Sequence, residues 1–504
     1  MKQVNLGMIG GGTVGSGVFN ALQQNAELMA ARTGVRLVVR KVAVKAFDEP
    51  RPYPITPSLM TLNWKDVVED PEIQIVTELV GGTGIAKVIV LAALERGKAV
   101  VTANKALLSA HGPELFAAAK KAGTNLYYEA SVAGGIPIIK TLREALVGNR
   151  FERIYGIVNG TCNYILTRMT REGAAFDAVL ADAQRLGYAE ADPTLDVDGH
   201  DAAHKTGILA SLAHGFWVDH HDIHVEGIRP LTPLDIRFAQ QLGYTIKLLG
   251  SVHLAEPAKG AKAAKGKKAK AAAGARISVA VSPTLVPQSH VLASVNDVFN
   301  AVFVSGFPIG DTLYYGRGAG KDATASAVLS DLADAGLDIT RSTLDRVPAF
   351  APCAQGTVIP YSETSSRFYL RLNVLDKPGV IAKVSAILSK AGISIASIVQ
   401  PEGNEGEAVP LILMTHRASR AAMDKARAAI AKLPAVKGPS LLLPVEDFTV
   451  ERITPMRWFG SVAGVESTRS PRSLLFELRQ LHGLADAATR QRRIGPRLQA
   501  YPNG

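Results

Sequence analysis

Short apolar runs alternate with stretches of helical spacing along the first quarter of the chain. The first run, residues 4–9, is mainly apolar and predicts a strand, and a helix is expected to follow to about residue 30. The same order then repeats, with strands expected at 35–44, 73–79 and 99–102 and helices near 86–96 and 113–122. Alternating strands and helices are typical of a parallel, doubly wound sheet. The N-terminal part is therefore predicted to be an α/β domain.

A glycine-rich segment joins the first strand to the first helix. Residues 10–15 read Gly-Gly-Gly-Thr-Val-Gly, which fits the pattern G-x-G-x-x-G. The first glycine of this pattern permits a tight turn, the second lets backbone amides approach a pyrophosphate, and the third allows close helix packing. A turn that binds no ligand is the alternative. The context favours a Rossmann-like dinucleotide-binding domain, with cofactor contacts from Gly10, Gly12, Thr13, Val14 and Gly15.

The residues near the end of the second strand bear on which dinucleotide is bound. An acidic residue is expected there if the ribose 2′-hydroxyl of NAD is recognised. This sequence instead has Arg40, Lys41 and Lys45, and Asp48 comes only later. Basic side chains suit a 2′-phosphate, so the sequence favours NADP, bound through Arg40 and Lys45, and leaves NAD open.

The pattern changes near residue 128, after which strands and helices no longer alternate regularly. Strands are expected at 151–158, 223–228, 246–254 and 277–285. This predicts an α+β domain over residues 128–310. A helix near 323–335 is expected to pack back on the nucleotide domain, which would comprise residues 1–127 completed by about 311–348.

The C-terminal part is predicted to hold a separate module. After a linker at 349–367, residues 368–447 follow the order strand, helix, strand, strand, helix, strand. That order is typical of a ferredoxin-like βαββαβ domain. Residues 448–504 form an Arg-rich tail of weak periodicity, which is expected to be disordered.

The net positive charge of the chain comes from two segments. Of the 504 residues, 56 are Lys or Arg and 45 are Asp or Glu, a net charge of +11. A Lys-rich insertion at 256–276 has seven basic residues against one acid, and residues 451–504 have nine against four. These two segments account for the whole net charge, so binding of nucleic acid by the body of the protein is not expected.

The composition also indicates the cellular compartment in which the protein is expected. Two cysteines are too few for a disulfide framework and suit a reducing environment. No apolar run approaches the roughly 18 residues needed to span a bilayer, so no membrane association is expected. The N-terminus lacks the layout of a signal peptide. A cytoplasmic protein is therefore expected.

A dense polar cluster lies between residues 187 and 205. Four acidic residues within 190–198 form a loop suited to an ammonium group. A helix expected to start near Gly199 places Asp201 and Lys205 one turn apart on one face. The carboxylate would keep the lysine charged, as suits a proton donor to a carbonyl. An ordinary helix ion pair is the alternative.

A lysine, a pair of histidines and a cysteine are further candidates for a functional role. Lys105 follows directly after a strand, where open α/β sheets bind ligands, although a surface lysine is the alternative. The i,i+4 pair His200 and His204 makes a zinc site conceivable, but Asp201 occupies the position of the glutamate in H-E-x-x-H. Cys162 has no histidine base nearby in sequence, so a buried, inert thiol is expected.

Together these segments resemble the homoserine dehydrogenases of the long bacterial type, which carry a C-terminal ACT domain. The resemblance covers about residues 2–447 in one collinear order. Its motifs are GGGTVGSGV, TANK, YEASVAGGIPII, NGTCNYI, GYAEADPTLDVDGHDAAHK and LDKPGV.

The resemblance implies reversible, NAD(P)-dependent interconversion of L-aspartate 4-semialdehyde and L-homoserine, on the route to threonine, methionine and isoleucine. Lys205 would be the proton donor, Lys105 a second cation at the same oxygen, and Asp201 a third member of the catalytic set. Implied substrate contacts are Glu190, Asp201, Asp196, Asn159, Gly160, Thr161 and Tyr188. Implied cofactor contacts are Thr102, Lys105, Gly187 and Gly320.

The resemblance also implies a monovalent cation, expected to be sodium, held by Glu129 and the backbone carbonyls of Val132, Gly134 and Ile136. Residues 128–310 would be the catalytic and dimerisation domain of a homodimer or homotetramer. The ACT module would bind threonine as a feedback regulator, with residues 376–379 near the ligand.

Two segments depart from the family pattern. The Lys-rich insertion stands where the family has a short loop, and the Arg-rich tail runs past the usual end. Neither touches a motif. Two alternatives are a regulatory protein that has lost turnover and an aspartate-semialdehyde dehydrogenase. Intact Lys105, Glu190, Asp201 and Lys205 argue against the first, and the second would need a nucleophilic cysteine paired with histidine, which is not apparent.

Overall fold

A computed structural model describes residues 1–255, 274–344, 346–350, 352, 355–404 and 406–448. Most of the Lys-rich insertion, and the Arg-rich tail from residue 449 on, therefore lie outside the described residues, and the expectation of disorder for the tail falls there. Among the described helices, none is both long enough and apolar enough to cross a membrane.

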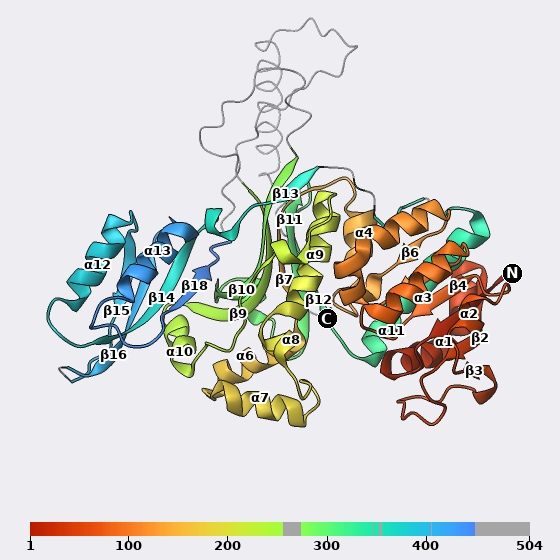
Figure 1. The fold of residues 1–504 in the computed structure, drawn as a ribbon, viewed down its shortest axis with the longest axis horizontal. Helices are drawn as coiled ribbons and strands as arrows, with labels where there is room; N and C mark the ends of the chain where they lie inside the picture. Colours follow the sequence, from red (N-terminus) through yellow and green to blue (C-terminus); the bar gives the residue numbers. More distant parts are fainter. Residues whose placement is uncertain (256–273, 345, 351, 353–354, 405, 449–504) are drawn as a thin grey trace, which may run out of the picture. The chain divides into compact units, whose positions relative to one another are not determined.

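The N-terminal sheet is parallel and has six strands in the order β3-β2-β1-β4-β5-β6 (Figure 1). Its strands are β1 (Lys2–Ile9), β2 (Val35–Ala43), β3 (Met60–Thr61), β4 (Ile75–Glu78), β5 (Ala99–Thr102) and β6 (Leu126–Tyr127). Its helices are α1 (Thr13–Thr33), α2 (Lys65–Val68), α3 (Gly84–Glu95) and α4 (Lys105–Lys121). The strand order reverses between β1 and β4, and ligands bind open α/β sheets at such a point. The predicted Rossmann-like sheet is confirmed.

One helix differs from its prediction. The helix expected near 113–122 begins eight residues earlier, because α4 starts at Lys105 and continues through Pro113. Asn104 caps this start, since its side chain accepts a hydrogen bond from the Leu107 N–H. The earlier start places Lys105 in the first turn of a helix rather than in a loop.

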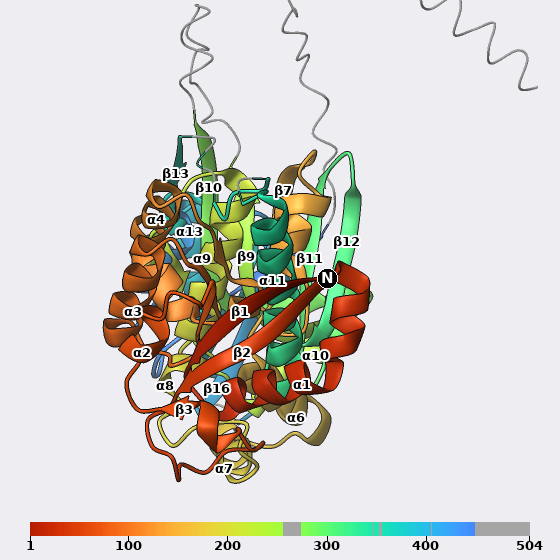
Figure 2. The same cartoon turned by 90° about the vertical axis from the view of Figure 1, so that its right-hand side faces the viewer.

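Helix α11 (Lys321–Arg341) packs beside α1 on the N-terminal sheet (Figure 2). Ala325, Val328 and Leu332 of α11 share a buried core with Val18 and Leu22 of α1. A segment that is distant in sequence therefore completes one face of the nucleotide domain.

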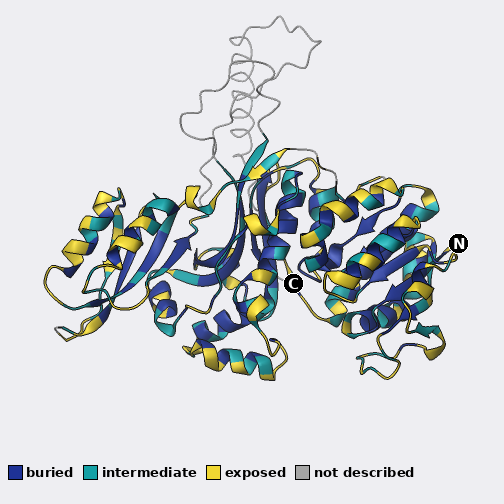
Figure 3. Ribbon diagram, in the orientation of Figure 1, coloured by how far each residue is buried: buried dark blue, intermediate teal, exposed yellow. Residues whose placement is uncertain are grey.

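A second sheet contains the other twelve described strands. Nine of them follow the path order β12-β11-β7-β9-β10-β18-β14-β16-β15, while β8 and β13 pair with β10 and β17 pairs with β14. The strands of its first part are β7 (Arg150–Ile157), β8 (His224–Val225), β9 (Tyr244–Leu254), β10 (Ala275–Pro287), β11 (Phe299–Phe307), β12 (Gly310–Arg317) and β13 (Gly356–Val358). The helices of this part are α5 (Ile138–Lys140), α6 (Gly160–Glu172), α7 (Phe176–Arg185), α8 (Thr194–Val197), α9 (His200–His214) and α10 (Pro233–Gln241). Its central strands are buried (Figure 3).

The C-terminal module has the predicted order of strands and helices. Its elements are β14 (Ser365–Leu375), α12 (Val380–Lys390), β15 (Ile395–Val399), β16 (Ala408–Thr415), the short β17 (Ala418–Ser419), α13 (Arg420–Ile430) and β18 (Leu441–Val445). The four long strands pair antiparallel in the order β18-β14-β16-β15, which is a ferredoxin-like sheet.

The module is joined to the preceding sheet. Strand β18 pairs with β10 at Leu285 and Val445, and the Glu446 N–H donates to the Leu285 carbonyl at 3.0 Å. A buried polar contact reinforces this junction. Asp235 of α10, fully buried, accepts hydrogen bonds from Arg371 Nε at 2.6 Å and from the Tyr369 hydroxyl at 3.1 Å, both on β14. The described part of the module is therefore anchored to α10 through an ion pair whose carboxylate is fully buried.

Candidate active site

The glycine-rich turn has the geometry that close approach of a dinucleotide requires. Gly10 has φ +106°, and a Cβ there would lie 2.5 Å from the Leu79 carbonyl oxygen. A Cβ on Gly15 would lie 1.9 Å from the Gly10 carbonyl oxygen, so neither position admits a side chain. At Gly12 nothing lies within 4 Å of such a Cβ, and no side chain caps α1. Open space in front of uncapped helix amides suits a pyrophosphate.

The basic residues near the end of β2 are not equivalent. Arg40 forms an ion pair with Glu72, and Lys41 pairs with Asp70 at 2.9 Å. Lys45, by contrast, follows the end of the strand and is exposed. Sequence reasoning missed Arg51, whose guanidinium donates to the carbonyls of Ala46 at 2.9 Å and Phe47 at 3.1 Å. It thereby shapes the loop that contains Lys45.

A buried carboxylate organises the ends of β4 and β5. Glu78 accepts hydrogen bonds from the Thr102 hydroxyl at 2.7 Å and from the N–H groups of Val80 at 3.0 Å and Gly81 at 3.2 Å. Thr102 in turn accepts from the Asn104 N–H at 3.0 Å. Glu78 thus positions the segment that leads into α4. Sequence reasoning missed it, although an acid that ends a buried strand before two glycines was a usable signal.

Two lysines from different parts of the fold meet at one carboxylate. Asp201 Oδ2 lies 2.7 Å from Lys205 Nζ, and Asp201 Oδ1 lies 3.1 Å from Lys105 Nζ. Lys205 Nζ also donates to the Val158 carbonyl at 2.7 Å, while the Lys105 side chain remains 38% exposed. The expected i,i+4 pair on α9 is thus present, and Lys105 of α4 joins it.

The electrostatics of this group follow from its burial and its partners. Burial alone would raise the pKa of the Asp201 carboxyl, but the ammonium groups of Lys205 and Lys105 outweigh it and hold that pKa well below its usual range. The carboxylate therefore stays charged and keeps both ammonium groups in place.

Asn159 links the group to a second carboxylate. Its Nδ2 donates to Asp196 Oδ1 at 2.7 Å and to Asp201 Oδ2 at 2.9 Å. Its Oδ1 accepts from the Cys162 N–H at 2.8 Å and so caps α6. Burial raises the pKa of Asp196. Cys162 is fully buried, and burial raises the pKa of its thiol well above its usual value, which agrees with an inert thiol.

The other predicted substrate and cofactor contacts lie on surrounding loops. The Thr161 hydroxyl donates to the Tyr188 carbonyl at 2.6 Å, and Gly160 is the first residue of α6. Glu190 is exposed on the loop after α7, and its backbone carbonyl accepts from Gln184. Two glycines have left-handed backbones, Gly187 with φ +76° and Gly320 with φ +116° before α11.

The segment predicted to bind a cation is buried and tightly turned. Both carboxylate oxygens of Glu129 accept backbone hydrogen bonds, from Ile139 at 2.9 Å and Lys140 at 2.7 Å. Burial raises the pKa of Glu129. Ala133 and Gly134 have φ +54° and +44°, and a Cβ on Gly134 would lie 2.6 Å from the Gly318 carbonyl oxygen. This turn therefore packs directly against the segment before α11.

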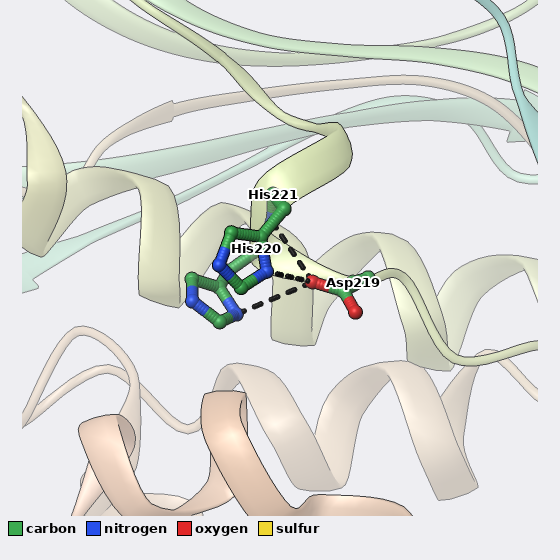
Figure 4. Close-up of side chains that lie close together, drawn as sticks. All are labelled: Asp219, His220 and His221. Carbon is green, nitrogen blue, oxygen red and sulfur yellow. Dashed lines mark hydrogen bonds and ion pairs between the residues drawn. The ribbon is translucent and has the colours of Figure 1, made fainter.

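His220 and His221, in the turn that follows α9, form a cluster with Asp219 in the described part of the chain. One ligand atom each of Asp219, His220 and His221 lies within 4.8 Å of the others (Figure 4). Asp219 Oδ1 lies 3.4 Å from His220 Nδ1 and 2.8 Å from His221 Nδ1, and it accepts the His221 backbone N–H. These contacts account for the arrangement without a metal.

The parallel sheet with its glycine-rich turn, the two lysines that meet at Asp201 and the ferredoxin-like module are together typical of an NAD(P)-dependent oxidoreductase with a C-terminal ACT module. Models of known families match along the chain: "Homoserine dehydrogenase, NAD binding domain" at residues 10–129, "Homoserine dehydrogenase" at 137–333 and "ACT domain" at 368–435. The chain belongs to the homoserine dehydrogenase family.

Individual relatives agree with this assignment. The chain is 45% identical to the homoserine dehydrogenase of Pseudomonas aeruginosa over 451 residues, which cover 88% of this chain and 99% of that protein. It is 42% identical to that of Neisseria gonorrhoeae over 452 residues, with 88% and 99% covered. Among solved structures, a homoserine dehydrogenase from Thiobacillus denitrificans aligns with a TM-score of 0.80 at 43% identity and covers 89% of this chain and 99% of that chain. A hyperthermophilic archaeal homoserine dehydrogenase in complex with NADPH aligns with a TM-score of 0.53 at 26% identity, covering 67% and 98%.

The position of Glu78 leads to a test of how the site is built. Glu78→Ala would leave the Thr102 hydroxyl and two backbone N–H groups without their buried acceptor. We expect a loss of about 1–3 kcal/mol in NADPH binding, roughly a 5- to 150-fold rise in Kd, because the segment before α4 loses its order. Kd is measured by the change in NADPH fluorescence. Glu95→Ala, on the exposed end of α3, is the control, and an unchanged Kd in Glu78→Ala would contradict the assigned role.

Proposed function

We propose that Lys205, Asp201 and Lys105 carry the homoserine dehydrogenase reaction of this chain, in which L-aspartate 4-semialdehyde is reduced to L-homoserine. The observation that supports this most directly is the contact of both lysines with one buried carboxylate. Lys105 comes from the strand-end edge where a nicotinamide would approach, and Lys205 comes from the second domain. The two ammonium groups therefore converge where cofactor and substrate would meet.

The dinucleotide fits the glycine-rich turn described above, and when bound it supplies a hydride to the carbonyl carbon. Negative charge then develops on the substrate oxygen, and fixed cations stabilise it. Lys205 donates a proton to that oxygen and Lys105 supplies a second positive charge. The hydrogen bonds of Lys205 to Asp201 and to the Val158 carbonyl fix the ammonium group before substrate arrives. Its proton is replaced from solvent in the following turnover.

The remaining polar groups are proposed to hold the substrate's amino acid end. Asn159 keeps Asp196 and Asp201 together, and their carboxylate oxygens suit an α-ammonium group. Gly160, Thr161 and Tyr188 line the loop beside it. Glu190 is exposed, and we propose that it contacts the ammonium group from the solvent side once substrate is bound.

NADP is proposed as the preferred dinucleotide. Lys45 is exposed beyond the end of β2, where a 2′-phosphate would lie, and Arg51 holds the same loop. Arg40 is engaged by Glu72, so Lys45 is the better placed of the two cations that the sequence suggested.

A sodium ion is proposed beside Glu129. A carboxylate in a buried site with a raised pKa is stabilised by a cation, and backbone carbonyls of the turn at Val132, Gly134 and Ile136 are hard oxygen donors. The Ile136 carbonyl also accepts the Ile138 N–H at 2.8 Å. The ion would hold the turn against the segment before α11, and no reaction step involves it.

Regulation by threonine and assembly into a homodimer or homotetramer complete the proposal. Residues 376–379 lead into α12 of the ACT module, and Gln400 donates to Asp376 at 3.0 Å, which ties that loop to the end of β15. Edge strand β12 presents Tyr315, 53% exposed, with Phe307 nearby in sequence at 68%. Exposed apolar side chains on an edge strand suit a second copy. The oxidation assay below, repeated with L-threonine, measures the regulation.

The catalytic assignment is tested with two variants of Lys205. Lys205→Ala removes the proton donor, and we expect kcat for NADPH oxidation with aspartate semialdehyde to fall by about 10²- to 10⁴-fold. Lys205→Arg keeps the charge but not a usable proton, and a similar fall is expected. Lys87→Ala is the control on a remote helix. Full activity of Lys205→Arg would refute proton donation, and absence of wild-type turnover would refute the function.

The cofactor assignment predicts different effects at two basic residues. Lys45→Ala is expected to raise KM for NADPH by roughly tenfold, because a charge-assisted contact to phosphate is lost, and to leave KM for NADH unchanged. Arg40→Ala should change neither value by more than about twofold, since Arg40 is paired with Glu72. Steady-state kinetics with NADPH and with NADH measures the two KM values for each variant. A larger rise in KM for NADPH in Arg40→Ala than in Lys45→Ala would assign the contact with the 2′-phosphate to Arg40 instead.

The cation assignment is checked without turnover. Replacing sodium chloride by choline chloride at equal ionic strength should lower the thermal unfolding midpoint of the wild type, because the charge of Glu129 loses its partner. In Glu129→Gln both salts should give the same midpoint. Equal midpoints for the wild type in the two salts would contradict a sodium site.

A further inference from the structure

A large cavity lies at the opposite end of the nucleotide domain from the active site. Its volume is about 1660 Å³, above the roughly 300–1,000 Å³ typical of small-molecule sites. Ile73, Lys98 and Asn125 in its wall precede strands β4, β5 and β6. Glu78 and Lys105 lie at the other ends of these strands. The cavity is therefore distinct from the dinucleotide and substrate sites.

Aromatic side chains form one wall. Phe116 of α4 lies 5.6 Å from Trp217 and 5.6 Å from Phe350, and Trp217 lies 5.5 Å from Phe350 between ring centroids. All three line the cavity. Such a set of rings offers edges and faces to a flat apolar ligand.

The same cavity carries an excess of positive charge. Arg96, Lys98 and Lys120 line it, against one acid, Glu69, which lies 3.6 Å from Arg96. Lys98 is buried, with its Nζ directed to the backbone carbonyls of Asp70 and Ile73. Burial lowers the pKa of this lysine, and within the described part of the chain its ammonium group donates to backbone carbonyls. A ligand that is aromatic at one end and anionic at the other would complement both features.

The cavity is connected to the catalytic residues through two helices. Helices α4 and α9 pack together, and their first turns hold Lys105 and Asp201, 3.1 Å apart. At the far end, Trp217 follows α9 and packs so closely on α4 that a Cβ on Gly112 would lie 2.5 Å from its ring. A ligand that shifted Trp217 and Phe116 would shift these packed helices, and with them the contact of Lys105 with Asp201.

We propose that this cavity is a regulatory site for a small aromatic anion, a ring system bearing a carboxylate or sulfonate, and that its occupancy changes the kinetics of the active site through α4 and α9. The binding part is independent of the proposed function. The kinetic part rests on it.

Two matched dyes test the binding part. 8-Anilinonaphthalene-1-sulfonate is an aromatic anion, and N-phenyl-1-naphthylamine is the same molecule without the sulfonate. Binding to the full chain is followed by dye fluorescence excited through tryptophan, with saturating NADP⁺, which does not fluoresce, present to occupy the dinucleotide site. We expect saturable binding of the anion that is at least about tenfold tighter than that of the neutral dye.

Charge reversal on the cavity rim locates the dye. Arg96→Glu combined with Lys120→Glu changes two exposed residues, so the fold should persist. The double variant should raise Kd for the anion by about tenfold or more and leave the neutral dye within about twofold. The control is Lys121→Glu, which neighbours Lys120 on α4 but does not line the cavity. An anion Kd unchanged in the double variant, or equally raised in Lys121→Glu, overturns the proposal.

The kinetic part uses NADPH oxidation with and without the anion. We expect KM for aspartate semialdehyde to change at least about threefold at saturating dye in the wild type, and not in the double variant at the same concentration. Charge-dependent binding with unchanged kcat and KM would refute the coupling through α4 and α9. If the wild type shows no turnover at all, the proposed function fails while the binding measurement still decides the site.

Discussion

The described structure depends on one electrostatic constraint, the burial of the Asp201 carboxylate. A buried carboxylate must be compensated, and here the compensation comes from two ammonium groups carried by different domains. Other residues hold the two lysines in place. Lys105 is in position because Asn104 caps α4, and Asn104 is held by the network around Glu78. Lys205 is in position because the carbonyl at the end of β7 accepts from it. The relative placement of the two domains at this edge is thus fixed by charge as well as by packing.

Much of this architecture could be predicted from local patterns. The glycine-rich turn between a strand and a helix indicated the parallel sheet, and the βαββαβ order indicated the C-terminal module. The pairing of Asp201 with Lys205 followed from helical spacing alone, since residues four apart share a face. These features are local, so a single sequence contains the information that defines them.

Other features depend on contacts between distant residues, which local patterns do not define. The start of α4 was placed too late, because its cap at Asn104 is fixed by a hydrogen bond to the carbonyl of Gly82 as well as by the local turn. The pairing of Arg40 with Glu72, 32 residues away, gives that arginine a partner that the basic run at the end of β2 did not suggest. Glu78 was missed because its role appears only when β4 and β5 lie side by side. The meeting of Lys105 with Asp201 was implied by family resemblance rather than by spacing.

The contact between Asp235 and β14 makes the catalytic sheet and the C-terminal module depend on each other. Asp235 also closes the cap of its own helix, where it accepts hydrogen bonds from the backbone and hydroxyl of Thr232. An apolar residue in place of Asp235 would therefore also break the capping box of helix α10. A chain that ended before β14 would lack the pairing of β18 with β10, and the Asp235 carboxylate would have no arginine partner. The module is therefore part of the hydrogen-bond network of the catalytic sheet, and the two cannot be separated without exposing a buried carboxylate.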